Sequence, residues 1–353
     1  MRHAQIARLL ALVIGLGFAF AAPAYADRAS HALPEEISRP LRAHVSFRML
    51  DMTKIQETSG EVSAIIEIRQ TWQDPTLRFD AIKAGRQRLD YAGEDAKARI
   101  GEIWTPALIT EGQIGEARSS TSSISVYSDG RVQLIEQIAG DFRFRTDLSA
   151  FPFDTQRVAF SFVSQYHPSD DVVFVVNDSD RAVSSYADRL TISDWTAQSL
   201  TFRNESFYGW NARPFSRLSV EIDMSRNWPR YVLRIFVPFV AVLSVSLFIL
   251  WGAVSDRPSI TYSALLALAA LGFTFESSFP GSMSVNSPIA LMISIGYFYL
   301  IITLLTDLFM ESSRFPLQAR FPHLPEETRQ VMRHLLPGLF VIICGCVILR
   351  SLA

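Results

Sequence analysis

The chain has 353 residues and a formal net charge of −2, with 49% hydrophobic and 19% charged residues. This length allows more than one domain, and the near-neutral charge gives no electrostatic argument for binding nucleic acid. The six histidines are scattered, and both cysteines lie inside one apolar run. We therefore expect no metal site and no cofactor. The sequence also has no nucleophile elbow, metal-ligand spacing or phosphate loop, which argues against an enzyme.

Residues 1–26 have the pattern of a secretory signal peptide. Arg2 and Arg8 give a basic start, residues 9–20 are apolar, and a small-x-small cleavage site ends at Ala26. The apolar core is shorter than the roughly 20 residues that span a bilayer. The mature chain is therefore expected to begin outside a bacterial inner (plasma) membrane.

Residues 27–229 are polar and contain short runs of alternating character, such as 44–49 and 63–68. Asp129-Gly130 separates two such runs and is typical of a hairpin turn, because both residues tolerate positive φ. Regularly spaced short strands without long helical periods predict an antiparallel, immunoglobulin-like β-sandwich. We expect this domain to lie in the periplasm.

Residues 230–353 change abruptly to long apolar runs, each near the length that crosses a bilayer as a helix. The predicted helices cover residues 231–251, 258–279, 288–309 and 331–352. The link between the last two carries several arginines and the link before the third carries none, which places the former in the cytoplasm. The fold class is thus a β + α membrane protein, a β-sandwich followed by a four-helix transmembrane bundle, with the C-terminus in the periplasm.

The second apolar run carries a polar stripe. Advancing about 100° per residue from Ser259 brings five further residues to within about 40° of it: Ser263, Leu266, Ala270, Phe273 and Ser277. Asp256 lies just outside this stripe at its inner end, and Glu276 lies near the outer end of the helix. The alternative is that the serines are small contacts between packed helices.

Several copies of such a face around one axis would line an aqueous pore. Hydroxyls can replace part of an ion's hydration shell, and rings of Leu266 and Phe273 would form apolar constrictions. Carboxylate rings at Asp256 and Glu276 would attract cations.

At this point the chain resembles the pentameric ligand-gated ion channels, the Cys-loop receptor superfamily, and most closely its bacterial ELIC-type members. The resemblance runs from about Val45 to the C-terminus and rests on six motifs in order. These are the strand segment from Trp72 to Asp80, Trp104-Thr105-Pro106, Phe151-Pro152-Phe153-Asp154, the run from Phe215 to Asn227, the pore segment with Pro280 beyond it, and Cys344 to Arg350. Phe144 and Val158 hold the positions of the eukaryotic disulfide, so the loop between them is expected to be held by packing.

The resemblance implies a homopentamer of identical subunits in a lipid bilayer, with a small-molecule agonist, an amine being the expected class, and permeant cations. The agonist site of the family lies between subunits. By position, the capping loop would contribute Phe202 and Phe215, the next aromatic position falls at Gln165 beside Tyr166, and the partner face would present Glu67 and Arg69. Gln165 departs from the family's aromatic pattern.

Coupling between the two domains is expected, by the same resemblance, at four residues: Phe153, Asp154, Arg226 and Pro280. Two alternatives to an agonist-gated channel remain. One is gating by protons on the same fold, and the other is a membrane-anchored periplasmic sensor that does not conduct.

Overall fold

The computed structural model describes residues 32–209, 211–247, 249–251, 256–278, 287–311 and 321–352. The expected signal peptide, residues 1–26, and the coupling residue Pro280 lie outside the described residues.

The first part of the chain forms two β-sheets. In the larger sheet six strands follow one another and a short seventh, β9, pairs with β1. Their order is β3 (Arg88–Ala92), β5 (Gln113–Tyr127), β6 (Arg131–Arg143), β2 (Glu61–Gln73), β1 (Leu41–Gln56) and β8 (Val172–Val175), with β9 at Ser185–Tyr186. The smaller sheet has the order β10 (Trp195–Tyr208), β11 (Pro214–Arg226), β7 (Thr155–Ser164) and β4 (Leu108–Glu111). Between strands lie the short helices η1 (Pro75–Leu77), α2 (Ala81–Ala84), α3 (Glu94–Glu102) and α4 (Asp178–Val183).

Alternating burial explains why the sheets pack face to face. Along β2, every second residue from Val62 to Trp72 is buried, because successive side chains of a strand point to opposite faces. Phe47 of one sheet packs against Phe160 of the other, with ring centroids 5.4 Å apart. The sheets are antiparallel except that β8 and β9 pair with β1 in parallel, so the fully antiparallel sandwich expected from the sequence is corrected at that edge.

Helices make up the second part. α7 (Arg257–Ser278), α8 (Pro288–Glu311) and α9 (Leu324–Leu352) are long, and within them three stretches are long and apolar enough to cross a bilayer: Arg257–Ser277, Pro288–Leu308 and Glu326–Arg350. A shorter apolar stretch, Leu233–Ser244, precedes them. The protein is therefore a β-sandwich followed by three long apolar helices and a shorter one.

The first apolar run is broken into pieces: α5 (Trp228–Tyr231), the π-helical turn η2 (Val232–Phe236), α6 (Val237–Leu247) and the 3₁₀ turn η3 (Ile249–Trp251). Pro238 supplies the physical reason, since proline has no N–H to donate and its ring clashes with the carbonyl four residues earlier, that of Arg234. A wider helical turn at that point relieves the clash.

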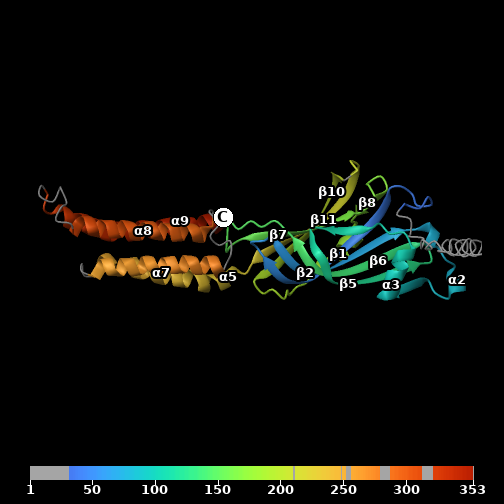
Figure 1. Cartoon of the computed structure of the whole chain (residues 1–353), viewed down its shortest axis with the longest axis horizontal. Coiled ribbons are helices and arrows are strands. Elements are labelled where there is room, and N and C mark those ends of the chain that lie inside the picture. Colours follow the sequence, from blue (N-terminus) through green and yellow to red (C-terminus); the bar gives the residue numbers. More distant parts are fainter. Residues whose placement is uncertain are drawn as a thin grey trace, which may run out of the picture.

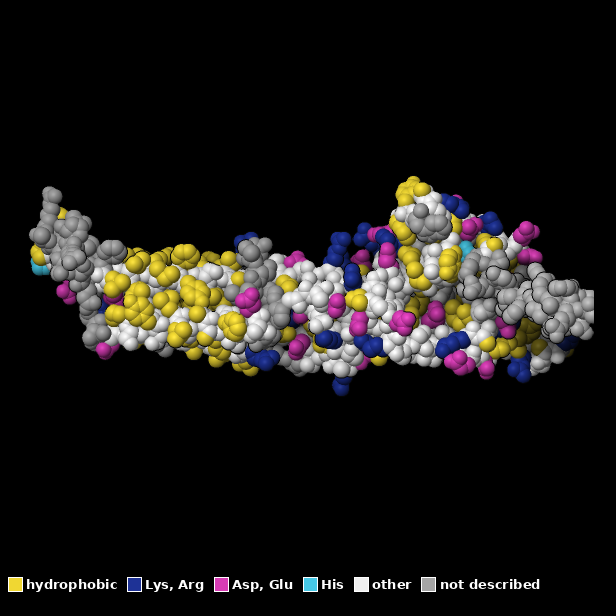
Figure 2. Space-filling model, in the orientation of Figure 1, with side chains coloured by type: hydrophobic (Ala, Val, Ile, Leu, Met, Phe, Trp, Pro, Cys, Tyr) yellow, Lys and Arg dark blue, Asp and Glu magenta, His cyan; other side chains and the backbone are white. Residues whose placement is uncertain are grey.

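The two parts lie end to end, and α7, α8 and α9 run along the long axis away from the sandwich (Figure 1). α6, α7, α8 and α9 contact one another in sequence, and α9 also contacts η3. Figure 2 shows hydrophobic side chains spread over the helices on the visible face, whereas charged side chains gather over the sandwich. Such an apolar exterior suits a lipid environment.

Candidate functional site

The six residues of the predicted polar stripe all lie on the exposed face of α7: Ser259, Ser263, Leu266, Ala270, Phe273 and Ser277. Leu266 and Phe273 expose 73% and 74% of their surface, although both are large and apolar. Leu268 and Phe275, on the other side, are buried in the core shared with α6 and α8. The bundle of one chain therefore leaves the stripe uncovered. Whether this face lines a pore stays a prediction.

Hydroxyl groups on this face are oriented by their own helix. Ser263 Oγ donates to the carbonyl of Ser259 at 2.9 Å, and Ser277 Oγ donates to that of Thr274 at 3.1 Å. A hydroxyl whose proton is held by the backbone turns its lone pairs outward. This face therefore offers acceptors, which are the ligands that cations need.

At the start of α7, neighbouring residues of opposite charge face different ways. Asp256 is exposed, whereas Arg257 is buried. The Arg257 guanidinium lies 3.4 Å from a carboxylate oxygen of Asp307 on α8, whose side chain is only 5% exposed. Asp307 is not among the residues predicted from the sequence, although an acid inside a predicted membrane helix is a signal of function.

The junction of the two domains is built around Arg226, the last residue of β11. Its guanidinium forms a two-point contact with Asp154, with nitrogen–oxygen distances of 2.6 and 3.1 Å, and both side chains are 2% exposed. Arg226 also reaches Glu57, in the turn between β1 and β2, at 3.0 Å, and the hydroxyl of Tyr231 in α5 at 3.2 Å. The structure thus brings the predicted pair Asp154 and Arg226 together and adds Glu57 and Tyr231.

Aromatic rings enclose the same guanidinium. The rings of Trp195 and Phe151 lie 4.2 and 4.6 Å from it. Burial lowers the pKa of Arg226, but its hydrogen bonds and the charges of Asp154 and Glu57 outweigh burial and hold that pKa above its ordinary value. Arg226 is therefore a permanently charged centre with partners on both sides of the domain boundary.

Phe153 connects this junction to the helices by aromatic packing. Its ring centroid lies 5.7 Å from that of Trp228 and 6.3 Å from that of Phe236. The loop that presents Phe153 is held by Gln156, whose side chain bonds the backbone of Asp147 in both directions, and this supplements the packing expected from the sequence. Trp195 gave no local signal in the sequence, since only the fold brings it to Arg226.

A partly shielded carboxyl group lies inside the sandwich. Glu136 on β6 accepts a hydrogen bond of 3.1 Å from the amide of Gln70, which is 1% exposed. Burial raises the pKa of Glu136, and the Gln70 hydrogen bond opposes this only in part. Its cross-strand neighbours, Ile68 and Ser122, carry no charge.

The predicted agonist residues are not gathered at one point. The β10–β11 register places Phe215 opposite Phe207, with ring centroids 5.9 Å apart, and Phe202 opposite Val220. Phe215 is 2% exposed, whereas Gln165 and Tyr166 are exposed. Phe215 is therefore part of a packed pair within its own hairpin.

Arginines of the same chain already cover two of the aromatic rings. The guanidinium of Arg181 lies 5.4 Å from the Phe202 centroid, and that of Arg217 lies 4.3 Å from the Phe207 centroid. Arg217 is held there by Glu111 at 2.8 Å. An amine ligand would have to displace Arg181 to contact the covered face of Phe202, and Arg217 to contact that of Phe207.

Glu67 and Arg69 lie on β2, in the sheet opposite to the capping hairpin, so one chain does not bring them to Phe202 or Phe215. Glu67 is paired with Arg48 at 3.4 Å. In the described residues, no group of three His, Cys, Asp or Glu side chains could hold a metal ion.

Comparisons with known proteins agree with this architecture. Residues 26–228 match the family model of the neurotransmitter-gated ion-channel ligand binding domain. A proton-gated ion channel of Gloeobacter violaceus is 21% identical over 304 residues, which cover 85% of this chain and 82% of that protein. The γ-aminobutyric acid receptor subunit pi of Mus musculus is 27% identical, and the neuronal acetylcholine receptor subunit alpha-10 of Rattus norvegicus is 22% identical. The matches cover 69% and 71% of this chain, but only 54% and 55% of these two receptor subunits.

Proposed function

Because the chain belongs to the family of pentameric, neurotransmitter-gated ion channels, we propose that it is one subunit of a homopentameric cation channel in a bacterial inner membrane. Its family is one of ion channels and not of enzymes. In this proposal residues 27–229 form the periplasmic sensing domain and residues 230–353 form the membrane domain with four transmembrane helices. We also propose that this channel is a bacterial ELIC-type member of the family.

The exposed face of α7 is the observation that supports conduction best. A helix that crosses the membrane beside its own bundle has no use for three outward hydroxyl groups in lipid, since polar groups there are costly. Five such faces around a common axis would enclose water. Leu266 and Phe273 would then close the path as apolar rings.

Cation preference follows from the charges along this face. Asp256, just before α7, and Glu276, on α7, are both exposed, and five copies of each would form two acidic rings. The neighbouring positive charge of Arg257 is withdrawn into the bundle by Asp307. Serine oxygens with outward lone pairs complete a path that suits cations.

Gating requires that a periplasmic signal favour the open arrangement over the closed one. Moving the open fraction from about 1% to 99% takes roughly 5.5 kcal/mol, or about 1 kcal/mol for each of five sites. We propose that Arg226 transmits this bias, with Asp154, Phe153 and the link at Pro280, because its contacts join the loop before β7, the β1–β2 turn and α5. Such a contact can be rearranged between two states.

For the signal itself, an amine between subunits remains the first candidate, with Phe202, Phe215, Gln165 and Tyr166 on one subunit and Glu67 and Arg69 on the next. Protons are a second candidate. The arginines over Phe202 and Phe207 disfavour an aromatic cage for a free amine, whereas Glu136 has a raised pKa inside the sandwich. The relative from Gloeobacter violaceus is described as proton-gated.

Ion flux into liposomes tests conduction. Purified protein is reconstituted and flux is measured across a pH series and with a panel of small amines. We expect flux that Ser259→Trp abolishes and that Leu339→Trp, a control on the lipid-exposed face of α9, leaves intact. Assembled protein without flux under any of these conditions would instead favour a non-conducting sensor. A response to pH without amine would identify protons as the signal.

A further inference from the structure

The exposed face of α7 is wider at its inner end than the predicted stripe. Tyr262 is 55% exposed, although the preceding residue, Thr261, is fully buried. Advancing about 100° per residue, Tyr262 lies about 60° from Ser259 and about 40° from Leu266, on the flank of the stripe. It therefore falls outside the range of about 40° around Ser259 that defines the stripe, and the helical pattern alone does not predict it.

The direction of the Tyr262 side chain determines which level of α7 its phenol group reaches. Side chains of an α-helix tilt toward its N-terminus and cover the turn that precedes them. This direction brings the phenol of Tyr262 to the level of Ser259. The hydroxyl of Thr261, by contrast, lies inside the bundle and donates to the carbonyl oxygen of Arg257 at 2.9 Å. Of these two adjacent residues, only Tyr262 presents its hydroxyl to the surroundings of the subunit.

The flank of α7 that carries Tyr262 faces another copy of α7 if the stripe faces a five-fold axis. In a ring of five helices, the directions from one helix to its two neighbours lie about 54° on either side of the direction to the axis, as in a regular pentagon. At about 60° from the centre of the stripe, Tyr262 points almost along one of these directions. Leu268 and Phe275, on the other side of α7, remain packed against α6 and α8. The phenol group would therefore lie in the gap between two adjacent α7 helices and not in lipid.

We propose that Tyr262 limits the size of the cations that the channel conducts, an inference that rests on the proposed pore. Five phenol groups in the gaps between neighbouring helices, at the level of the Ser259 ring, would narrow the passage there. Each hydroxyl can donate to the Ser259 hydroxyl or the Asp256 carboxylate of the adjacent copy, which fixes the aromatic ring in place. Tyrosine has few rotatable bonds, so this constriction has a defined diameter. Small inorganic cations pass it, whereas larger organic ammonium ions are excluded.

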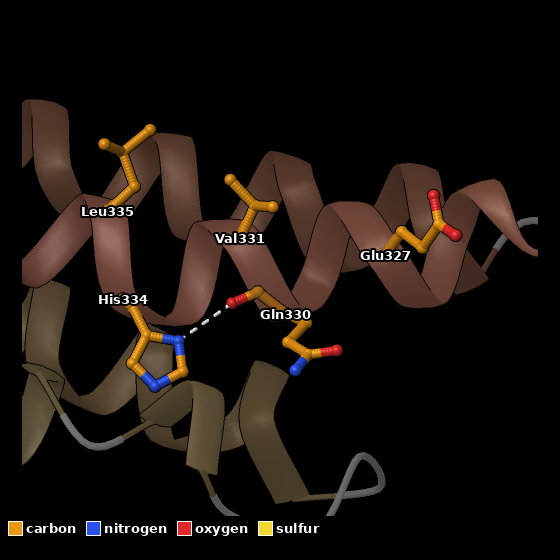
Figure 3. A pocket seen from close by; sticks show the side chains of 5 residues that line it. All are labelled: Glu327, Gln330, Val331, His334 and Leu335. Atoms are coloured by element: carbon orange, nitrogen blue, oxygen red, sulfur yellow. Dashed lines mark hydrogen bonds between the residues drawn. The ribbon is translucent and has the colours of Figure 1, made fainter.

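The helix α9 offers a matched control position at the same end of the bundle. The turn η3 contacts both α7 and α9, and His334 of α9 packs edge-on against Trp251 of η3, with ring centroids 5.4 Å apart. Here α9 forms a shallow pocket lined by Glu327, Gln330, Val331, His334 and Leu335. In Figure 3, Gln330 and His334 point to one side of the helix, and Val331 and Leu335 point to the other. Leu335 is 53% exposed, so it matches Tyr262 in exposure but lies on a different helix.

Reversal potentials with a different cation on each side of the membrane test the size limit. Protein in planar bilayers is exposed to Na⁺ on one side and to tetramethylammonium or dimethylammonium on the other. We expect Tyr262→Ala to raise the permeability of tetramethylammonium relative to Na⁺ about tenfold or more, because the loss of one group from a fitted site changes discrimination by that order. Tyr262→Phe keeps the aromatic ring and should keep most of the size limit. Leu335→Ala should match the wild type.

The outcomes separate this assignment from the proposed channel. Wild-type currents with equal permeability ratios in the wild type and in Tyr262→Ala would contradict the role of Tyr262 and leave the channel intact. Assembled wild type without current under any condition would contradict the channel itself. If Tyr262→Ala does not assemble, Tyr262→Trp decides: its larger ring should lower the relative permeability of dimethylammonium, and an unchanged value would overturn the proposal.

Discussion

Asp307 shows how one buried residue can set the charge that a neighbouring surface presents. It pairs with Arg257 inside the bundle, while the adjacent Asp256 stays exposed. Removing its charge would add one net positive charge per subunit beside Arg257, near the inner end of α7. At about 10 Å from an axial cation in a watery pore, each added charge costs about 0.4 kcal/mol, hence about 2 kcal/mol for five.

We therefore expect Asp307→Asn to lower the cation-to-anion permeability ratio roughly tenfold or more, and Asp256→Ala to lower it as well. Reversal potentials in a salt gradient measure this ratio. Asp307→Glu keeps the charge and should keep the selectivity. Normal currents with an unchanged reversal potential in Asp307→Asn would show that this pair has no part in selectivity.

Glu136 makes the stability of the folded protein depend on pH. Because its pKa is raised in the folded state, the folded protein binds this proton more tightly than the unfolded chain does. The resulting stabilisation is complete below the ordinary glutamate pKa and is lost as pH rises through the raised value. Glu136→Gln keeps a hydrogen-bonding group opposite Gln70 but cannot ionise.

We expect Glu136→Gln to raise Tm at pH 7.5, with little change at pH 4, and so to reduce the dependence of Tm on pH. Thermal unfolding of both proteins across this range measures it. Glu67→Gln, at an ion-paired position on the neighbouring strand β2, is the control and should not raise Tm at pH 7.5. Parallel Tm curves for wild type and Glu136→Gln would count against a shielded carboxyl.

The helix α7 has one buried face and one uncovered face. Cysteine labelling can show whether the uncovered face is in contact with water or with lipid. The native Cys344 and Cys346 are first replaced by serine. In membranes with the channel open, Ser259→Cys and Ser263→Cys should react with a charged, water-soluble thiol reagent. Leu268→Cys, fully buried, and Ile342→Cys, exposed on α9, should not. If neither serine position reacts with the reagent, as Ile342→Cys also does not, the stripe faces lipid.

At the scale of the whole molecule, the junction around Arg226 joins a domain that stays in water to one that stays in lipid. Arg226→Gln leaves Asp154 buried and unpaired, and such a loss costs about 3–5 kcal/mol. Adding Asp154→Asn removes the stranded charge and should recover a large part of the stability. Chemical denaturation of the single and double variants gives the coupling energy directly. Additive effects would mean that the two side chains do not act as a pair.

The order of the two domains and the type of each follow from the sequence alone. Alternation along strands such as β2 and the length of the apolar runs are local properties, so they can be read without knowing what packs against them. The same holds for the stripe on α7, because helical periodicity fixes which residues share a face. The family motifs placed Asp154 and Arg226 at the domain boundary before any contact between them was known.

Which distant side chains meet depends on how the folded chain packs. Trp195 lies beside Arg226 because the β10–β11 register pairs the two residues. Asp307 reaches Arg257 because α8 packs against α7, and no spacing along the chain encodes either contact. Likewise, strand register and not sequence separation put Phe215 beside Phe207 and away from Phe202. The break in the first apolar helix follows from the proline, but its π-helical turn depends on how the backbone relieved the clash. Periodic patterns are fixed locally, whereas long-range contacts are fixed by packing.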